Sequence, residues 1–238
     1  MESSSVDQNI KLVSSTNERV CDVFIKIGGS ILDDVSQTAA LLPHIIALSS
    51  RYRMLILVGG GIIAKRIKAN QRERNTDFYR CWRSGALCHD VNAGLLASYS
   101  PVFEVASSAA EAMRCLDSGQ IAVFAATSAL INNLFFTPDW RITTDSMGVF
   151  WANAMRAKRY VIVSNVDGMH EKWPDAGPPI PKIKIADLER LPSSKLDAAF
   201  PSFFRRYPLP TFIVNGKYPD RVRDAICGEW TIGTEIVA

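Results

Sequence analysis

Short runs of apolar residues alternate along this chain with longer segments in which apolar side chains recur every three or four positions. The short runs are rich in Val, Ile and Phe, which is typical of buried strands. We predict strands over residues 23–27, 54–58, 102–105, 121–124, 160–164 and 211–214.

The segments between these runs have the periodicity of helices. We predict helices over residues 35–50, 62–71 and 87–98. In the last of these segments Leu87, Val91 and Leu95 are spaced four apart, which places their side chains on one face of the helix.

Three more helices are predicted from signals at their ends. Ser108 and Glu111 have the spacing of a capping box, so a helix is expected to run from there to about residue 117. Thr144 is expected to cap a helix over residues 145–156. Pro219 suits the first turn of a helix that ends at Cys227.

The alternation of strands and helices predicts the α/β fold class, as a three-layer αβα sandwich around a mainly parallel sheet with right-handed crossovers. Residues 1–20 are polar and Ser-rich and are expected to form a disordered or loosely docked tail. Residues 21–238 then form the folded domain. The Pro-rich residues 173–181 are expected to form an exposed loop. We expect an acceptor-binding part over about 21–158 and a nucleotide-binding part over about 159–238, sharing one sheet.

Composition changes this picture little. The chain has 238 residues, of which 47% are hydrophobic and 21% charged, as is usual for a globular domain with a sizeable core. Its net charge of +3 is too small to indicate nucleic acid or membrane binding, and neither is expected. No signal segment precedes the fold, and the five cysteines have no metal-site spacing. A reducing, cytoplasmic location is therefore expected.

Glycines follow four of the predicted strands. Gly28 and Gly29 come after the first strand, a triple glycine at 59–61 after the second, and single glycines at 168 and 216 after the fifth and sixth. The carboxyl ends of parallel strands line one edge of the sheet, where ligands bind. Glycine lets backbone N–H groups approach a phosphate closely. Any one loop is equally explained as a simple turn, but four on one edge indicate a phosphate site.

Two charged residues stand out beside these loops. Lys26 lies near the end of an apolar strand, where an ammonium group is costly unless an anion pairs with it. A phosphate at Gly28 and Gly29 would supply that anion. Asp145 lies at the start of a predicted helix, either as a capping acid or as a carboxylate that orients a catalytic lysine, and the two roles are compatible. A P-loop is excluded, because Ala64 stands where that motif needs glycine.

Four short motifs occur in a fixed order: Lys-Ile-Gly-Gly-Ser at 26–30, Gly-Gly-Gly at 59–61, Thr-Asp-Ser at 144–146 and Asn-Val-Asp-Gly at 165–168. In this order they resemble the amino acid kinase superfamily, which includes acetylglutamate, aspartate, carbamate and uridylate kinases. The resemblance runs from about residue 23 to the C-terminus and implies an amino acid kinase-like fold.

The resemblance also implies roles for single residues. Those implied to be catalytic are Lys26, Asp145 and Lys195, although a solvated first-turn residue is an equal alternative for Lys195. Those implied to hold the nucleotide are Gly28, Gly29, Ser30, Ser164, Asn165, Asp167 and Gly168. Those implied to hold the acceptor include Gly59, Gly60, Gly61 and Thr144. No residue is expected to be a metal ligand.

Arginines and tryptophans add candidates on the acceptor side. Four arginines follow the triple glycine, at positions 72, 74, 80 and 83, and a guanidinium fork suits a phosphate. We take Arg80 as the candidate, with a solvated helix face as the alternative. Trp82 and Trp140 are assigned to core or interface packing, with a wall for an aromatic acceptor as the alternative.

The function implied is that of an ATP-dependent kinase that transfers the γ-phosphoryl group of ATP to a small anionic acceptor such as a phosphomonoester. Mg²⁺ is expected to arrive with the nucleotide. Residues 139–146 and 197–201 are similar to the branch that contains the aminomethylfuran methyl-phosphate kinase. Residues 214–216 and 232–234 are similar to the molybdenum storage protein, so an oligomer that binds ATP and stores metal oxyanions is the alternative. A homo-oligomer, either dimer or hexamer, is expected from the same resemblance.

Overall fold

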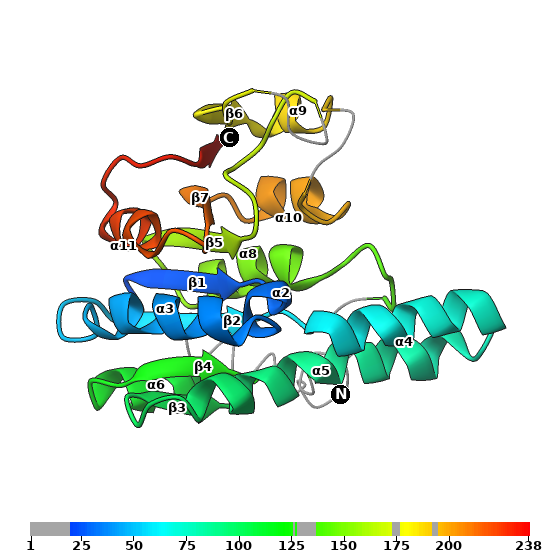
Figure 1. Ribbon diagram of the computed structural model, residues 1–238, viewed down its shortest axis with the longest axis horizontal. Coiled ribbons are helices and arrows are strands. Elements are labelled where there is room, and N and C mark those ends of the chain that lie inside the picture. Colours follow the sequence, from blue (N-terminus) through cyan, green and yellow to red (C-terminus); the bar gives the residue numbers. More distant parts are fainter. Residues whose placement is uncertain (1–19, 126, 128–136, 173–176, 192–194) are drawn as a thin grey trace, which may run out of the picture.

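A computed structural model describes residues 20–125, 127, 137–172, 177–191 and 195–238 (Figure 1). The predicted tail therefore lies outside the described residues, except for Val20, which is buried. The same holds for residues 173–176 of the predicted loop, while residues 177 and 178 are exposed as expected.

Eight strands form one sheet in the order β3-β4-β2-β1-β5-β7-β8-β6. The strands are β1 (Val23–Ile27), β2 (Met54–Val58), β3 (Phe103–Ala106), β4 (Ile121–Phe124), β5 (Arg159–Ser164), β6 (Lys182–Lys184), β7 (Thr211–Asn215) and β8 (Thr234–Val237). From β3 to β7 along the sheet all pairings are parallel, whereas β8 pairs antiparallel to β7 and parallel to β6. The mainly parallel sheet is confirmed.

The six predicted strands are all present within one residue of their expected ends, but β6 and β8 were not predicted. Both belong to the edge of the sheet beyond β7. β6 has a single apolar residue, Ile183, between two exposed lysines, so it lacks the apolar run that marks the other strands. Its pairing with β8 is a tertiary contact that local sequence does not encode.

Nine helices of the described residues surround this sheet. They are α2 (Gly29–Leu32), α3 (Val35–Ile46), α4 (Gly61–Arg74), α5 (Phe78–Ala97), α6 (Ala109–Asp117), α8 (Thr144–Ala154), α9 (Ile185–Leu188), α10 (Phe200–Arg206) and α11 (Pro219–Cys227). Ser108 caps α6 as predicted, because its hydroxyl accepts from the N–H of Glu111 at 3.2 Å. The predicted cap of α8 is wrong by one position: Thr143 is the N-cap, and Thr144 is the first helical residue.

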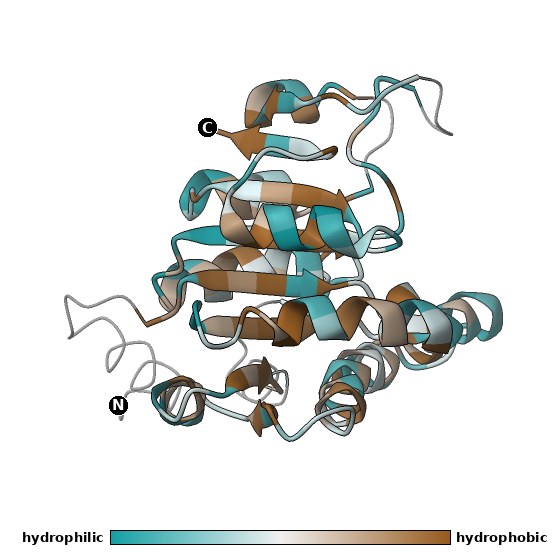
Figure 2. Cartoon of the chain, turned by 60° about the vertical axis from the view of Figure 1, so that its left-hand side comes forward, coloured by the Kyte–Doolittle hydropathy of each residue, from teal (hydrophilic) through white to brown (hydrophobic). Residues whose placement is uncertain are grey.

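The central strands are largely hydrophobic (Figure 2). Their side chains alternate between two hydrophobic clusters, one on each face of the sheet. Phe24 and Tyr160 face the cluster that includes α6, α8 and α10. Ile25 and Val161 face the cluster that includes α3, α5 and α11. Because strand side chains alternate, Lys26 lies on the same face as Phe24, toward α8.

Helices α4 and α5 extend together from the edge of the sheet at which the carboxyl end of β2 lies (Figure 1). The buried face of α5 includes Trp82, His89 and Leu96. Leu87, Val91 and Leu95, which were predicted to share one face, are 37%, 63% and 48% exposed. The periodicity of this helix was therefore right, but part of its apolar surface has no neighbour in the described chain. Among the described helices none is long and apolar enough to cross a membrane.

Candidate active site

The glycine loops after β1 and β2 lie against each other. A side chain on Gly29 would collide with the backbone of Gly61, and one on Gly59 would meet the backbone nitrogen of Gly29. Gly61 also has φ +62°, a conformation that glycine adopts without strain. The two loops thus form a surface of bare backbone at the carboxyl edge of the sheet, which is suited to a phosphate.

Lys26 reaches from β1 to the first turn of α8, where its Nζ atom lies 2.8 Å from Oδ1 of Asp145. Both side chains are about nine-tenths buried, with 11% and 9% of their surface exposed. A buried ammonium needs an anion, and Asp145 supplies it. The carboxylate in turn holds the ammonium group beside the glycine loops, because Lys26 and Gly28 to Ser30 line the same cavity.

Asp197 fixes the turn that carries Asp145. One of its carboxylate oxygens accepts from the backbone N–H and the hydroxyl of Thr143, both at 2.8 Å, and from the N–H of Ser146 at 3.0 Å. The other oxygen accepts from the hydroxyl of Ser146. Burial, followed by the negative charge of Asp145, raises the pKa of Asp197, while these hydrogen bonds favour its ionised form. Asp197 therefore acts as a tertiary cap for α8.

Tyr160, on strand β5, holds the same turn from the side of the sheet. Its buried hydroxyl lies 3.2 Å from the carbonyl oxygen of Thr144 and 3.3 Å from that of Asp145, and it donates to them. A side chain on Gly148 would collide with this hydroxyl. The glycine in α8 thus lets β5 and α8 approach closely enough for Tyr160 to hold the first turn.

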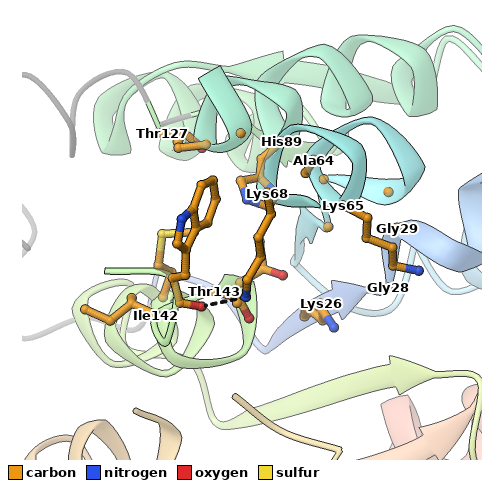
Figure 3. A pocket seen from close by; sticks show the side chains of 18 of the residues that line it. Lys26, Gly28, Gly29, Ala64, Lys65, Lys68, His89, Thr127, Ile142 and Thr143 are labelled. Carbon is orange, nitrogen blue, oxygen red and sulfur yellow. Dashed lines mark hydrogen bonds between the residues drawn. The ribbon is translucent and has the colours of Figure 1, made fainter. Parts of the chain in front are cut away.

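A cavity of about 290 Å³ opens in front of these groups (Figure 3). Besides Lys26, the glycine loops and the start of α8, it is lined by Ala64, Lys65, Lys68, Trp82, Gly85, Ala86, His89, Thr127, Trp140, Ile142, Met147 and Ser164. Glycine backbone, Lys26 and Lys65 make up one side of the cavity, and Lys68 lies on the other side with the aromatic and aliphatic side chains.

Lys68 crosses this cavity from α4 and donates to the carbonyl oxygen of Trp140 at 3.2 Å (Figure 3). Its ammonium group also lies 5.6 Å from the centre of the Trp140 ring. Burial, and next the charge of Arg72, lowers the pKa of Lys68. No carboxylate of the described residues lies within ion-pair distance of it, so Lys68 can still bind an anion.

His89 lines the cavity as a neutral imidazole. Burial lowers its pKa to about 4. Its Nδ1 atom lies 3.2 Å from the carbonyl oxygen of Val58. Since a carbonyl only accepts, Nδ1 carries the proton and Nε2 is left as a hydrogen-bond acceptor. His89 therefore adds no positive charge to the cavity near neutral pH.

The predicted nucleotide residues fall into two groups. Gly28, Gly29, Ser30 and Ser164 line the cavity. Asn165, Asp167 and Gly168 follow β5 and do not line it. Asp167 is held by Asn215 at 3.0 Å and by Arg221 at 2.8 Å, and Arg221 in turn lies over the ring of Tyr218 at 3.8 Å.

On the acceptor side the structure brings Gly59, Gly60, Gly61 and Thr144 into the cavity. It does not bring Arg80 there, because Arg80 lies exposed in the first turn of α5. Lys195 is exposed, and it is not among the lining residues.

Sequence reasoning missed Lys65 and Lys68 as site residues. Together with Gly61 and Ala64 they occupy one face of α4, with spacings of three and four. Counting these spacings along the helix from the triple glycine would have identified both lysines. Trp82 and Trp140 were assigned to packing, yet both line the cavity. Asp197 was marked only as part of the motif at 197–201, and its bond to Thr143 was not predicted because the two residues are 54 positions apart.

In the part of the chain that the structure describes, no group of three or more His, Cys, Asp or Glu side chains lies together to hold a metal ion. A magnesium ion at this site would therefore be held mainly by phosphate oxygens, as is usual for nucleotide-bound Mg²⁺.

Comparison with known proteins gives a consistent result. A model of the amino acid kinase family matches residues 23–203. A (5-(aminomethyl)furan-3-yl)methyl phosphate kinase of Methanocaldococcus jannaschii is 25% identical over 219 residues, which cover 90% of this chain and 96% of the relative. A uridylate kinase of Methanothermobacter thermautotrophicus is 28% identical over 236 residues, which cover 90% of this chain and 98% of the relative.

Solved structures show the same fold. The uridylate kinase of Archaeoglobus fulgidus superimposes with a TM-score of 0.74 at 21% identity, and the match covers 91% of this chain and 100% of that one. The UMP kinase of Bacillus anthracis gives a TM-score of 0.72 at 23% identity, over 91% of this chain and 95% of that one.

Proposed function

Since this chain belongs to the amino acid kinase family, we propose that it is an ATP-dependent kinase that transfers the γ-phosphoryl group of ATP to a small phosphomonoester. The observation that carries this proposal is the buried ion pair of Lys26 and Asp145, 2.8 Å apart, beside two glycine loops in contact. The named relatives, which are kinases of phosphate-bearing substrates, support it. The alternative, oxyanion storage, has no contact in its favour among the described residues of the cavity.

Phosphoryl transfer asks the protein mainly for alignment and charge neutralisation. An oxygen of the acceptor's phosphate would bond to the γ-phosphorus while the bond from that phosphorus to the bridging oxygen of ADP breaks. Lys26 would neutralise charge on the transferred group, and Asp145 would hold the ammonium in place. The backbone of Gly28, Gly29 and Gly59–Gly61 would position the phosphates. Mg²⁺, arriving with ATP, would supply further positive charge.

The nucleotide body is proposed to lie beyond β5, bordered by Ser164, Asn165, Asp167 and Gly168. The network of Asp167, Asn215 and Arg221 supports this placement, because it rigidifies the carboxyl edge of β5 and β7. Lys195 remains a proposed second lysine, and in the structure it lies outside the cavity lining.

Two further expectations belong to the proposal. A homo-oligomer is supported by the exposed apolar stripe on α5, which is formed by Leu87, Val91 and Leu95. A cytoplasmic location is supported by the five cysteines, all of which are free thiols in the structure.

The test is ADP production with a panel of phosphomonoesters. Lys26→Ala is expected to lower kcat by about 10²–10³-fold, which is the usual cost of removing one such charge-stabilising group. Lys184→Ala, which changes an exposed lysine on the far edge strand β6, is the matched control and should leave kcat unchanged. Because Lys26→Ala leaves Asp145 buried without a partner, the double variant Lys26→Met/Asp145→Asn checks the same point without a buried charge. Full activity in either variant would refute the proposal.

A further inference from the structure

The acceptor side of the cavity is positively charged and holds no free carboxylate. Of its described lining residues three are lysines, Lys26, Lys65 and Lys68, and none is Asp or Glu. Asp145 lies behind Lys26 and is already paired with it. The two carboxylates that act on Lys68, those of Asp139 and Asp197, lie outside the lining. Asp139 is paired with Arg141, and Asp197 accepts from Thr143 and Ser146. Among the described residues an ammonium group on a ligand would therefore contact lysines and no unpaired carboxylate.

Lys68 is placed to bind the acceptor's phosphate. Its side chain runs across the cavity toward Thr143, close to the turn that holds Asp145 and Lys26 (Figure 3). Its partner in the structure is a neutral carbonyl oxygen, so its charge is only weakly compensated. A phosphate oxygen would give it a charge-assisted hydrogen bond, which is about twice as strong as a neutral one. Lys68 would thus hold the phosphate from the side opposite to the glycine loops.

The remaining wall is aromatic and rigid. The indole nitrogen of Trp140 donates to Gln71 at 3.4 Å, and the ring meets Phe78 edge-on with centroids 6.2 Å apart. The indole nitrogen of Trp82 donates to the carbonyl oxygen of Asp139 at 3.2 Å. With their polar ends already bonded, both rings offer apolar surface to the cavity, and such fixed rings favour a planar ligand.

On the basis of the proposed function, we infer that the acceptor is a phosphomonoester carried on an uncharged planar ring, with its phosphate bound by Lys68 and its ring packed against Trp140. An ammonium group on the ring is excluded by the three lysines. This acceptor class differs from the aminomethyl-bearing phosphate in the name of the Methanocaldococcus jannaschii relative. Lys68 and Trp140 are thus specificity-determining residues.

The inference is tested by binding, which does not require turnover. The full chain, with Mg²⁺ and a non-hydrolysable ATP analogue, is titrated calorimetrically with benzyl phosphate, 4-(aminomethyl)benzyl phosphate and propyl phosphate. Benzyl phosphate is expected to bind at least about tenfold more tightly than either of the others, a factor that corresponds to about 1.4 kcal/mol. Equal or tighter binding of the aminomethyl compound, equal binding of propyl phosphate, or no binding of benzyl phosphate would overturn the inference.

Variants test whether Lys68 causes the preference against the ammonium group and whether Trp140 causes the preference for a ring. Lys68→Met should weaken the binding of all three phosphates and abolish the preference for benzyl phosphate over the aminomethyl compound. Lys68→Glu should reverse this preference. Trp140→Leu should remove the preference for benzyl over propyl phosphate. Arg66→Met, on the same helix but outside the cavity lining, should change neither ratio. A purely structural role would not alter these ratios, so unchanged ratios in Lys68→Met count against the inference.

Turnover separates this inference from the proposed function. If ADP forms in a Lys26-dependent way with other phosphomonoesters while the expected binding order is absent, the kinase function holds and the acceptor class is wrong. If the binding order is as expected but no phosphomonoester yields ADP, the acceptor class holds and the kinase function is wrong.

Discussion

A lysine within an apolar strand is tolerated at this site because the fold supplies its partner from another element. Lys26 shares a face of the sheet with Phe24, and that face is covered by α8, whose first turn carries Asp145. The strand therefore determines which way the ammonium points, and the helix determines which charge meets it. Strand side chains alternate between the two faces of the sheet, and this alternation directs Lys26 toward the N-terminus of α8. The proposed phosphate site lies at that point.

His89 provides a test of the electrostatics at the level of one residue. Its pKa is lowered to about 4 by burial, compared with 6.5 in the unfolded chain. The folded protein therefore disfavours protonation of His89. The stability that comes from keeping His89 neutral is fully present above pH 6.5 and is lost as the pH falls toward 4. From pH 7 to pH 4 the wild type should lose about 3 kcal/mol more unfolding free energy than His89→Gln.

The measurement is urea denaturation of both proteins across this pH range. Groups common to both proteins cancel in the difference, which isolates His89. A difference that does not change with pH would show that His89 titrates normally and is exposed to water in solution.

At the level of elements, α8 is held at its first turn by a residue that lies far along the chain. Asp197→Asn keeps the size of the side chain but replaces one of its two acceptor oxygens with an NH₂ donor, so the donors of Thr143, Ser146 and Ala199 cannot all keep their partners. We expect a loss of about 1–3 kcal/mol of unfolding free energy, as for buried donors left without partners. A small displacement of the turn would lower kcat by about 10²-fold through Lys26 and Asp145, with a smaller effect on KM for ATP.

The control for this prediction is Asp187→Asn on α9, an exposed carboxylate that pairs with Arg190, two residues beyond the end of that helix. Such surface pairs contribute little, and neither stability nor kcat should change noticeably. The comparison combines thermal unfolding with steady-state kinetics. A stable Asp197→Asn protein with full kcat would mean that the turn holds its shape without this carboxylate.

Helix α5 offers a matched pair of glycines. A methyl group on Gly85 would lie 2.9 Å from the Trp140 ring, whereas one on Gly94 would meet nothing within 4 Å. Gly94→Ala should therefore stabilise the protein by about 0.5–1 kcal/mol, which is the usual gain from replacing a helical glycine. Gly85→Ala should lack this gain, because it displaces Trp140.

Kinetics distinguish the two variants further. Gly85→Ala should raise KM for the acceptor and leave KM for ATP unchanged, while Gly94→Ala should change neither. Calorimetric melting and initial rates are the measurements. An equal gain in stability with unchanged acceptor KM in both variants would show that Trp140 is not held against α5 as described.

At the level of the whole molecule, the features that could be predicted from the sequence are those determined by residues close together in the chain. β1 and β2 have the predicted ends because their apolar runs begin after a polar residue and stop at glycine. The glycine loops, Lys26 and Asp145 were likewise marked by their places at element ends. Contacts between distant segments were not predictable in this way: Lys68 meets Trp140 across 72 positions of the chain.

The exposed stripe on α5 concerns the molecule as a subunit. Leu87, Val91 and Leu95 are between 37% and 63% exposed, although they repeat at helical spacing like a buried face. In a two-fold dimer the same stripe would serve both partners, so Val91 would lie near its own symmetry mate. Val91→Glu would then place two carboxylates opposite each other and raise the dissociation constant by at least about tenfold.

Light scattering coupled to size-exclusion chromatography measures this change over a range of concentrations. Val35→Glu, which alters an exposed valine at the start of α3 away from the stripe, is the control and should leave the mass unchanged. Circular dichroism establishes that both variants are folded. Because α5 also supplies Trp82, Gly85 and His89 to the cavity, a dissociated Val91→Glu protein should bind the acceptor more weakly if partner contact steadies the helix. A wild type that is monomeric at every concentration, or a Val91→Glu protein that keeps its oligomeric mass, would rule out this surface as the subunit interface.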